Sequence, residues 1–272
     1  MILNLKKLNE HIPYVHFKME NFEIALELVS KDMYFASVDI KHAYYSIPIA
    51  EEQQIYFRFI WRGKIFQFQC MPNGVASGPR YYTKLMKPVY AKLRSDGHIS
   101  TGFIDDSLLG GQTRDRCIEN IHATTGLMST LGFVLNSDKS VLEPTQTITY
   151  LGNVLDSVNM RVTLPSDKKD KIQHECSKIH SCQTATIRAV AKVIGLLVSS
   201  FSAVELGKLH YRELVKCKSL ALQENRGNVD APMNISLAMK SELKWWIDNV
   251  RTQSRKIRRD NPKIVIQTDS SM

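Results

Sequence analysis

Short runs typical of β-strands alternate with longer runs at helical spacing over the first two-thirds of the chain. Residues 33–40 (MYFASVDI) are rich in β-branched and aromatic residues and predict a strand that ends near Asp39. Two similar runs flank Arg62 and Gly63, a pair typical of a two-residue turn. This stretch therefore predicts a β-hairpin.

Two helices and several further strands follow in the same part of the chain. Ser77 is a suitable N-cap for a helix over 79–93, in which Pro88 can introduce a kink. A second helical pattern covers 113–131, and Gly132 is suited to end it. Further apolar runs predict strands, and they cover residues 133–136 and 148–164.

The pattern changes at Pro165 to one that is almost purely helical. Four stretches have apolar residues at helical spacing: 166–180, 184–199, 202–223 and 235–250. Near the end, VIQTDSS again has a strand pattern that reaches Asp269. We therefore expect three parts, with boundaries at 1–164, 165–262 and 263–272, the last of them the beginning of an incomplete domain.

Composition and charge favour a globular intracellular protein with a polyanionic partner. The 272 residues are 43% hydrophobic, and 36 Lys and Arg against 27 Asp and Glu give a net charge of +9, which favours a polyanionic partner. The five cysteines form no C-x-x-C pair, as expected for an intracellular protein, either in a cytoplasmic particle or in the nucleus. No apolar stretch is long enough to cross a bilayer, so we expect no membrane partner.

The stretch FIDDS places Asp105 and Asp106 side by side within apolar sequence. Two carboxylates about 5 Å apart repel each other by roughly 3 kcal/mol at an effective dielectric of about 20, so a cation is expected nearby. We expect both aspartates at the tip between strands 101–104 and 107–109. Taken alone, such a pair more often marks a polar turn that faces water.

Asp39 supplies a third carboxylate, because it also ends an apolar strand. If the strands are neighbours in one sheet, Asp39 and Asp105 converge on one point, with Asp106 beside them. Mg²⁺ prefers carboxylate and phosphate oxygens, and two such ions can bind the attacking and leaving oxygens of a phosphoryl transfer. The three aspartates therefore predict a metal site.

This arrangement resembles the palm of reverse transcriptases, and the resemblance extends from residue 2 to residue 156. Five motifs occur in the family's order: VDIKHAYYSIPI, MPNGVASGP, FIDDS, LGFVLNSDKS and TYLGNVLD. The sequence around them is most similar to retrotransposon polymerases of the DIRS and gypsy-like groups. Departures are Phe103, where the family commonly has Tyr, and Asn73, where other members have Gln or Phe.

The resemblance implies an α+β fold, the right-hand polymerase, with fingers and palm in residues 1–164. It further implies a helical thumb and connection in 165–262. The last strand resembles the first strand of a ribonuclease H domain, with Asp269 as a metal carboxylate. Relative to the family, we expect the chain to be truncated at both ends.

The family's metal and proton-transfer roles fall on five positions. Asp39 and Asp105 would hold two Mg²⁺ ions, or Mn²⁺ as a substitute, with the backbone carbonyl of Ile40 as a further ligand. Asp106 would complete the negative cluster. Lys139 would protonate the leaving pyrophosphate.

The remaining family roles concern the nucleic acid and the nucleotide. The backbone near Ala43 would contact the triphosphate, and Tyr44 would lie under the sugar. The positions that would contact the nucleotide or hold the primer are Asn73, Gly74, Tyr150, Leu151 and Gly152. The implied partners are an RNA or DNA template with its primer, deoxynucleoside triphosphates and other retroelement proteins.

Two functions remain open from the sequence. The aspartate triad favours RNA- and DNA-directed DNA polymerisation. The absence of the family's basic fingers segment and the short ribonuclease H region favour an inert remnant that at most binds nucleic acid. The two differ in whether the chain extends a primer.

Overall fold

The structure is a computed structural model that describes residues 3–257 and consists of two compact units, which divide between Leu151 and Gly152. This division lies before the 164/165 boundary that the change of pattern predicts. Asp269 and the whole segment 263–272 lie outside the described residues. Within the described part of the chain, no helix is long and apolar enough to cross a membrane.

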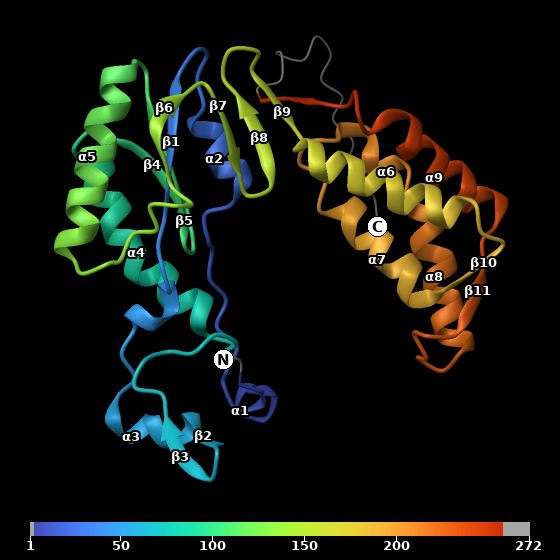
Figure 1. Ribbon diagram of the computed structural model, residues 1–272, viewed down its shortest axis with the longest axis horizontal. Helices are drawn as coiled ribbons and strands as arrows, with labels where there is room; N and C mark the ends of the chain where they lie inside the picture. Colours follow the sequence, from blue (N-terminus) through green and yellow to red (C-terminus); the bar gives the residue numbers. More distant parts are fainter. Residues whose placement is uncertain (1–2, 258–272) are drawn as a thin grey trace, which may run out of the picture. The chain divides into compact units, whose positions relative to one another are not determined.

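A four-stranded antiparallel sheet forms the centre of the first unit (Figure 1). Its strands, in spatial order, are β4 (Ile99–Phe103), β5 (Asp106–Gly111), β1 (Tyr34–Asp39) and β6 (Val141–Thr145). The strand predicted over 33–40 is thus confirmed as β1. Because side chains alternate along a strand, Ala36, Val38 and Leu109 face one side, and Phe35 and Leu108 face the other.

Helices α4 (Gly78–Ser95) and α5 (Arg114–Thr130) cover one face of this sheet (Figure 1). Their apolar side chains, among them Tyr82, Met86 and Met128, join Ala36, Val38 and Leu109 in one buried cluster. Both predicted helices are confirmed, and α4 continues through Pro88. The Thr113 hydroxyl accepts a hydrogen bond from the Arg116 amide and so caps α5.

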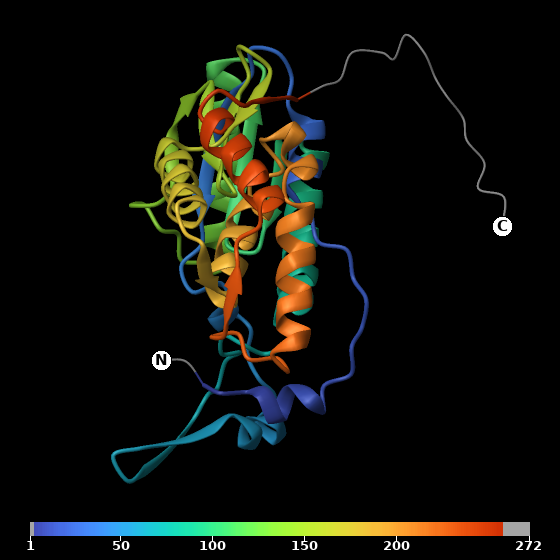
Figure 2. The same cartoon turned by 90° about the vertical axis from the view of Figure 1, so that its right-hand side faces the viewer.

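The hairpin predicted at Arg62 and Gly63 is confirmed as β2 (Arg58–Trp61) and β3 (Lys64–Gln67). Both turn residues have positive φ, 47° and 73°, as a type I′ turn requires. The hairpin extends away from the sheet (Figure 2). The other elements of the first unit are α1 (Lys6–Glu10), α2 (Phe22–Leu28), η1 (Ala43–Ser46), α3 (Glu51–Gln54), η2 (Ile55–Phe57) and β7 (Thr147–Tyr150).

One predicted strand is absent from the structure, and one strand was not predicted. Residues 133–136 form no strand, and their only pairing in the described part of the chain is an isolated bridge between Leu135 and Ile40. Strand β6 was not predicted, and it contains Pro144, a residue that is unfavourable inside a strand. The proline is tolerated here because β6 lies at an edge of the sheet, where an amide is not needed on the outer side.

Helices dominate the second unit, as the sequence predicts. The helical elements are α6 (Ser166–His180), α7 (Ile187–Val198), η3 (Glu205–Leu209), α8 (Arg212–Glu224) and α9 (Leu237–Asn249). The strands are β8 (Asn153–Asp156), β9 (Arg161–Thr163), β10 (Thr184–Thr186), β11 (Pro232–Asn234) and β12 (Arg255–Lys256). Helix α6 has the predicted bounds, whereas 184–186 form a strand in place of the first turn of a helix.

The helix predicted over 202–223 is broken between η3 and α8 by a tertiary contact. The indole of Trp246 is fully buried and donates a hydrogen bond to the carbonyl of His210 at 2.7 Å. A Cβ atom on Gly207 would lie 2.6 Å from the same indole. The large ring therefore occupies the space at the break, and the pattern of the predicted helix alone does not reveal it.

Candidate active site

The strand register places Asp39 of β1 directly opposite Asp106 of β5. Residues paired across antiparallel strands point to the same face, so both carboxylates lie on the face opposite α4 and α5. The sequence expectation brings Asp39 together with Asp105 and sets Asp106 beside them; the register shows the pairing of Asp39 with Asp106. In the structure Asp105 lies in the adjoining turn.

This turn consists of Ile104 and Asp105, because Phe103 pairs with Asp106. The predicted strands 101–104 and 107–109 are therefore corrected: Ile104 leaves the first strand, and Asp106 begins the second. Ile104 has φ 54°, which is rare for a β-branched residue and costs on the order of 1–3 kcal/mol. The amide of Ile40 donates a hydrogen bond to the Asp105 carbonyl at 2.9 Å, which holds the turn against the end of β1.

Repulsion from the neighbouring carboxylates is visible in the pKa of Asp106. Burial raises the pKa of Asp106, and the charges of Asp105 and Asp39 raise it further, while Lys139 opposes this shift. Among residues 3–257, no three His, Cys, Asp or Glu side chains form a ready metal cluster. The donors that the register does bring together are the carboxylates of Asp39 and Asp106, and carboxylate oxygens are the ligands that Mg²⁺ prefers, usually one or two of them plus substrate phosphates.

Lys139 lies in a loop that is fixed to the end of β1. The Asp39 amide donates to the Ser140 hydroxyl at 3.0 Å, and the Asn136 amide donates to the Asp39 carbonyl at 2.9 Å. The amide of Lys139 in turn donates to the Asn136 carbonyl at 3.3 Å. The side chain of Lys139 is exposed, and its charge acts on Asp106.

Tyr44 lies beside the aspartates in η1, which follows β1 directly. Its ring packs edge to face against Tyr82, with 5.8 Å between the ring centres. Burial and the charge of Asp105 both raise the pKa of Tyr44, so its hydroxyl remains neutral at physiological pH. The neighbouring Ala43 is buried in the cluster under the sheet.

Asn73 and Gly74 form an exposed turn before α4, and Gly74 has φ 101°, which favours glycine. The side chain of Asn9 in α1 donates to the Gly74 carbonyl and accepts from the Ala76 amide, both at 2.9 Å. Asn9 therefore holds the turn in place. This role could not be predicted from the sequence, because a single Asn in a polar helix carries no signal for a contact 65 residues away.

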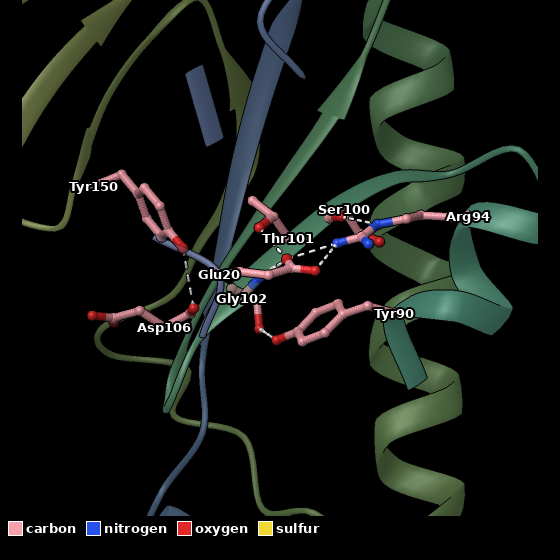
Figure 3. A network of polar contacts seen from close by, with 9 residues as sticks. Glu20, Tyr90, Arg94, Ser100, Thr101, Gly102, Asp106 and Tyr150 are labelled. Atoms are coloured by element: carbon pink, nitrogen blue, oxygen red, sulfur yellow. Dashed lines mark hydrogen bonds and ion pairs between the residues drawn. The ribbon is translucent and has the colours of Figure 1, made fainter. Parts of the chain in front are cut away.

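Tyr150 connects β7 to the aspartate hairpin. It is 4% exposed, and its hydroxyl donates to the Asp106 carbonyl at 3.4 Å (Figure 3). Leu151 and Gly152 follow with φ values of 47° and 72°, which form a tight turn. The division between the two units falls between these two residues.

Figure 3 shows a second group of residues around the same hairpin that the sequence did not single out. Glu20 lies between Arg94 and strand β4, and the hydroxyl of Tyr90 is 2.7 Å from that of Ser107. These residues come from the loop before α2 and from the second half of α4. Nothing in the local sequence predicts their contact.

Comparison with known proteins agrees with this geometry. Residues 1–155 match the family described as reverse transcriptase (RNA-dependent DNA polymerase). The chain is 25% identical over 162 residues to the Gag-Pol polyprotein of avian reticuloendotheliosis virus, covering 56% of this chain and 14% of that protein. It is 24% identical over 174 residues to the enzymatic polyprotein of soybean chlorotic mottle virus, covering 63% and 24%.

Solved structures show the same fold over nearly the whole chain. A foamy viral protease-reverse transcriptase in complex with an RNA/DNA hybrid has a TM-score of 0.73 at 17% identity, covering 93% of this chain and 32% of that one. The same kind of protein in complex with double-stranded DNA has a TM-score of 0.72 at 18% identity, covering 96% and 51%. The mixed fold of helices and sheets is thus the reverse transcriptase fold. Because the family match covers more than half of the 272 residues and includes all three aspartates, the chain belongs to the reverse transcriptase family.

Proposed function

We propose that the chain is an RNA- and DNA-directed DNA polymerase of a retroelement. The observation that carries this proposal is the pairing of Asp39 with Asp106 across β1 and β5, with Asp105 in the adjoining turn. The chain spans 14% and 24% of the two viral relatives described above, so their activities extend to this chain only as part of the proposal. We further assign the chain to the DIRS-type or gypsy-like retrotransposons, from the sequence around its motifs.

Asp39 and Asp105 would hold two Mg²⁺ ions together with the carbonyl of Ile40, and Asp106 would add negative charge beside them. When bound, these ions would stabilise the charge that develops on the attacking and leaving oxygens. The support for this assignment is that Asp39 and Asp106 are paired on one face and that the charges of Asp39 and Asp105 both act on Asp106. Nucleotide phosphates would supply the further oxygen ligands that Mg²⁺ prefers. Mn²⁺, which also prefers oxygen ligands, would be a substitute.

The chain's own residues would place the substrates around this centre. Tyr44, held against Tyr82, would lie under the sugar of the incoming nucleotide, and the backbone near Ala43 would contact the triphosphate. Asn73 and Gly74 would contact the nucleotide from the turn that Asn9 holds.

Proton transfer and primer placement complete the proposed roles. Lys139 would donate a proton to the leaving pyrophosphate, because its ammonium is exposed and acts on the same charge cluster. Tyr150, Leu151 and Gly152 would hold the primer end. Residues 1–164 would then be fingers and palm, and 165–262 would be thumb and connection.

An RNA or DNA template with its primer is the proposed partner. The net charge of +9 supports a polyanionic partner, and the similar foamy viral proteins were solved with an RNA/DNA hybrid and with double-stranded DNA. Deoxynucleoside triphosphates would be the second substrate.

Primer extension tests the proposal. The wild-type chain is incubated with a primed RNA template, deoxynucleotides and Mg²⁺, then with Mn²⁺, beside Asp105→Asn/Asp106→Asn. Asp115→Asn, an exposed aspartate in the first turn of α5, is the matched control. We expect extension by the wild type and the control and none by the double variant. A folded wild-type chain that binds primer-template in a salt-sensitive way without extending it would instead be an inert nucleic-acid-binding remnant.

A further inference from the structure

Strand β4 is an edge strand, and its outer edge is occupied by an ion pair in place of another strand. The sheet order is β4-β5-β1-β6, so β5 pairs with only one edge of β4. Backbone groups on the other edge of such a strand are open to water or to another chain. Here Glu20 and Arg94 bind three consecutive residues along this edge: Ser100, Thr101 and Gly102.

Glu20 acts as the hydrogen-bond acceptor along this edge, and Arg94 acts as the donor. Glu20 accepts hydrogen bonds from the Gly102 amide at 3.3 Å and from the Thr101 hydroxyl. Arg94 donates from Nη2 to both oxygens of Glu20, at 2.6 and 2.7 Å, and from Nε to the Ser100 carbonyl at 2.8 Å. The ion pair thus bonds to the strand as a neighbouring strand would (Figure 3).

Burial distinguishes this ion pair from the one between Arg114 and Glu143. The side chain of Glu20 is 24% exposed, compared with 77% for Glu143 in the ion pair with Arg114. Burial alone would raise the pKa of Glu20, but the hydrogen bonds from Arg94 and Thr101 outweigh it, and the pKa lies below its ordinary value. Glu20 is therefore charged at neutral pH.

The opposite side of β4 is fixed by Tyr90. A Cβ atom on Gly102 would lie 1.9 Å from the Tyr90 hydroxyl, so only glycine leaves space for this ring. The same hydroxyl is 2.7 Å from that of Ser107, the residue paired with Gly102 across the hairpin. Gly102 is therefore held on its edge by Glu20 and on its face by Tyr90.

We propose that Glu20 and Arg94 are positioning residues that hold the Asp105–Asp106 hairpin in its working geometry, an inference that rests on the proposed polymerase function. Gly102 lies two residues before Ile104, whose positive φ persists only while the surrounding structure holds it. Release of the edge lets this turn relax and displaces the Asp105 carboxylate. Small displacements of a catalytic group cost large factors in rate.

Burst kinetics of single-nucleotide incorporation test this at a temperature where the variants are folded by circular dichroism. Glu20→Ala removes the acceptor, and Glu143→Gln in the exposed ion pair with Arg114 is the control. We expect Glu20→Ala to lower the burst rate at least tenfold, with the burst amplitude, the KM for the nucleotide and the Kd for primer-template within twofold. Glu143→Gln should keep the wild-type rate.

A merely structural role would lower the burst amplitude, which counts active molecules, and leave the burst rate unchanged. That result would overturn the proposal. Should Glu20→Ala fail to fold, Arg94→Lys replaces it, because lysine keeps the charge but cannot donate to Glu20 and to the Ser100 carbonyl in the same geometry. We expect the same loss of rate with unchanged amplitude.

Binding of Mn²⁺ to the protein with primer-template, followed by electron paramagnetic resonance, separates this inference from the proposed function. We expect Glu20→Ala to weaken Mn²⁺ binding at least threefold and Glu143→Gln to leave it unchanged. If the wild type binds Mn²⁺ and shows this difference without extending primers, the positioning role stands and the polymerase function fails. If a folded Glu20→Ala matches the wild type in rate and in Mn²⁺ binding, the positioning role is wrong.

Discussion

The first unit contains two β-hairpins with two-residue turns that are stabilised in different ways. In β2–β3, the turn residues Arg62 and Gly63 suit positive φ, and the strands are largely exposed, with Ile60 at 73% and Ile65 at 71%. In β4–β5, Ile104 is held at positive φ, and the strands are mostly buried. Local turn chemistry determines the first hairpin, whereas contacts from distant segments determine the second.

This difference shows how the fold provides for a site that its local sequence does not favour. An isoleucine at positive φ and neighbouring carboxylates both cost free energy. Hydrogen bonds around the β4–β5 hairpin offset that cost, and they come from Glu20, Arg94, Tyr90 and Tyr150. The β2–β3 hairpin needs no such support.

Replacing one glycine in each hairpin with alanine should give the largest difference in stability between the two hairpins. Gly102→Ala places a methyl group 1.9 Å from the Tyr90 hydroxyl and should lower the free energy of unfolding by about 1–3 kcal/mol, and abolish primer extension. Gly63→Ala meets no atom within 4 Å and should cost about 1 kcal/mol, from its φ of 73° alone. Urea unfolding of both variants measures this; equal losses would contradict the account.

Removal of one hydroxyl tests the support beneath the hairpin. Tyr90→Phe leaves the buried Ser107 hydroxyl without its partner and should destabilise the protein by about 1–2 kcal/mol. Tyr56→Phe is the control, because Tyr56 is 62% exposed and should change stability by less than about 0.5 kcal/mol. If Tyr90→Phe leaves the stability unchanged, the ring of Tyr90 supports the hairpin without its hydroxyl.

Acid should weaken the β4–β5 hairpin through Glu20. Its pKa is lower in the folded protein than the ordinary 4.5, so its stabilising effect is complete above pH 4.5 and is lost as the pH falls through the folded pKa. The difference in unfolding free energy between wild type and Glu20→Gln should therefore be constant from pH 7 to pH 5 and shrink below pH 4.5. A difference that grows in acid would contradict the lowered pKa.

The smallest expected effect is an improvement of the exposed turn. Arg62→Asn creates the Asn-Gly pair that type I′ turns favour and should raise stability by about 0.5 kcal/mol, with no change in extension rate. A shift in the midpoint of thermal unfolding measures it. A loss of stability would show that the contact of Arg62 with the Trp61 ring stabilises the protein more than the Asn-Gly turn does.

The features that could be predicted from the sequence are those that depend on neighbouring residues alone. The sequence pattern placed the turn of β2–β3 correctly, because Gly63 marks that turn, and it gave the bounds of α6. It placed the turn of β4–β5 one residue late, since no local rule puts Ile104 at positive φ. The pairing of Phe103 with Asp106 sets that position.

The sequence predicted the carboxylates of the candidate site but not the residues that hold them in place. Three aspartates at strand ends are visible as a pattern, and the register brings Asp39 opposite Asp106. The supporting contacts join residues that are far apart in the sequence: 65 residues separate Asn9 from Gly74, and 82 separate Glu20 from Gly102. Arg94 and Glu20 are likewise 74 residues apart, so only the fold reveals these contacts. Sequence patterns thus identified the candidate chemistry, and the structure identified what holds it.

Single-nucleotide incorporation on a primed RNA template with Mg²⁺ tests the central claim most directly, because Asp39 is the residue that the register adds to the hairpin. We expect Asp39→Asn to lower the incorporation rate at least a thousandfold, while the control Asp115→Asn stays within twofold of the wild type. A rate for folded Asp39→Asn within tenfold of the wild type would contradict the claim that the carboxylate of β1 and those of the β4–β5 hairpin together form the catalytic centre.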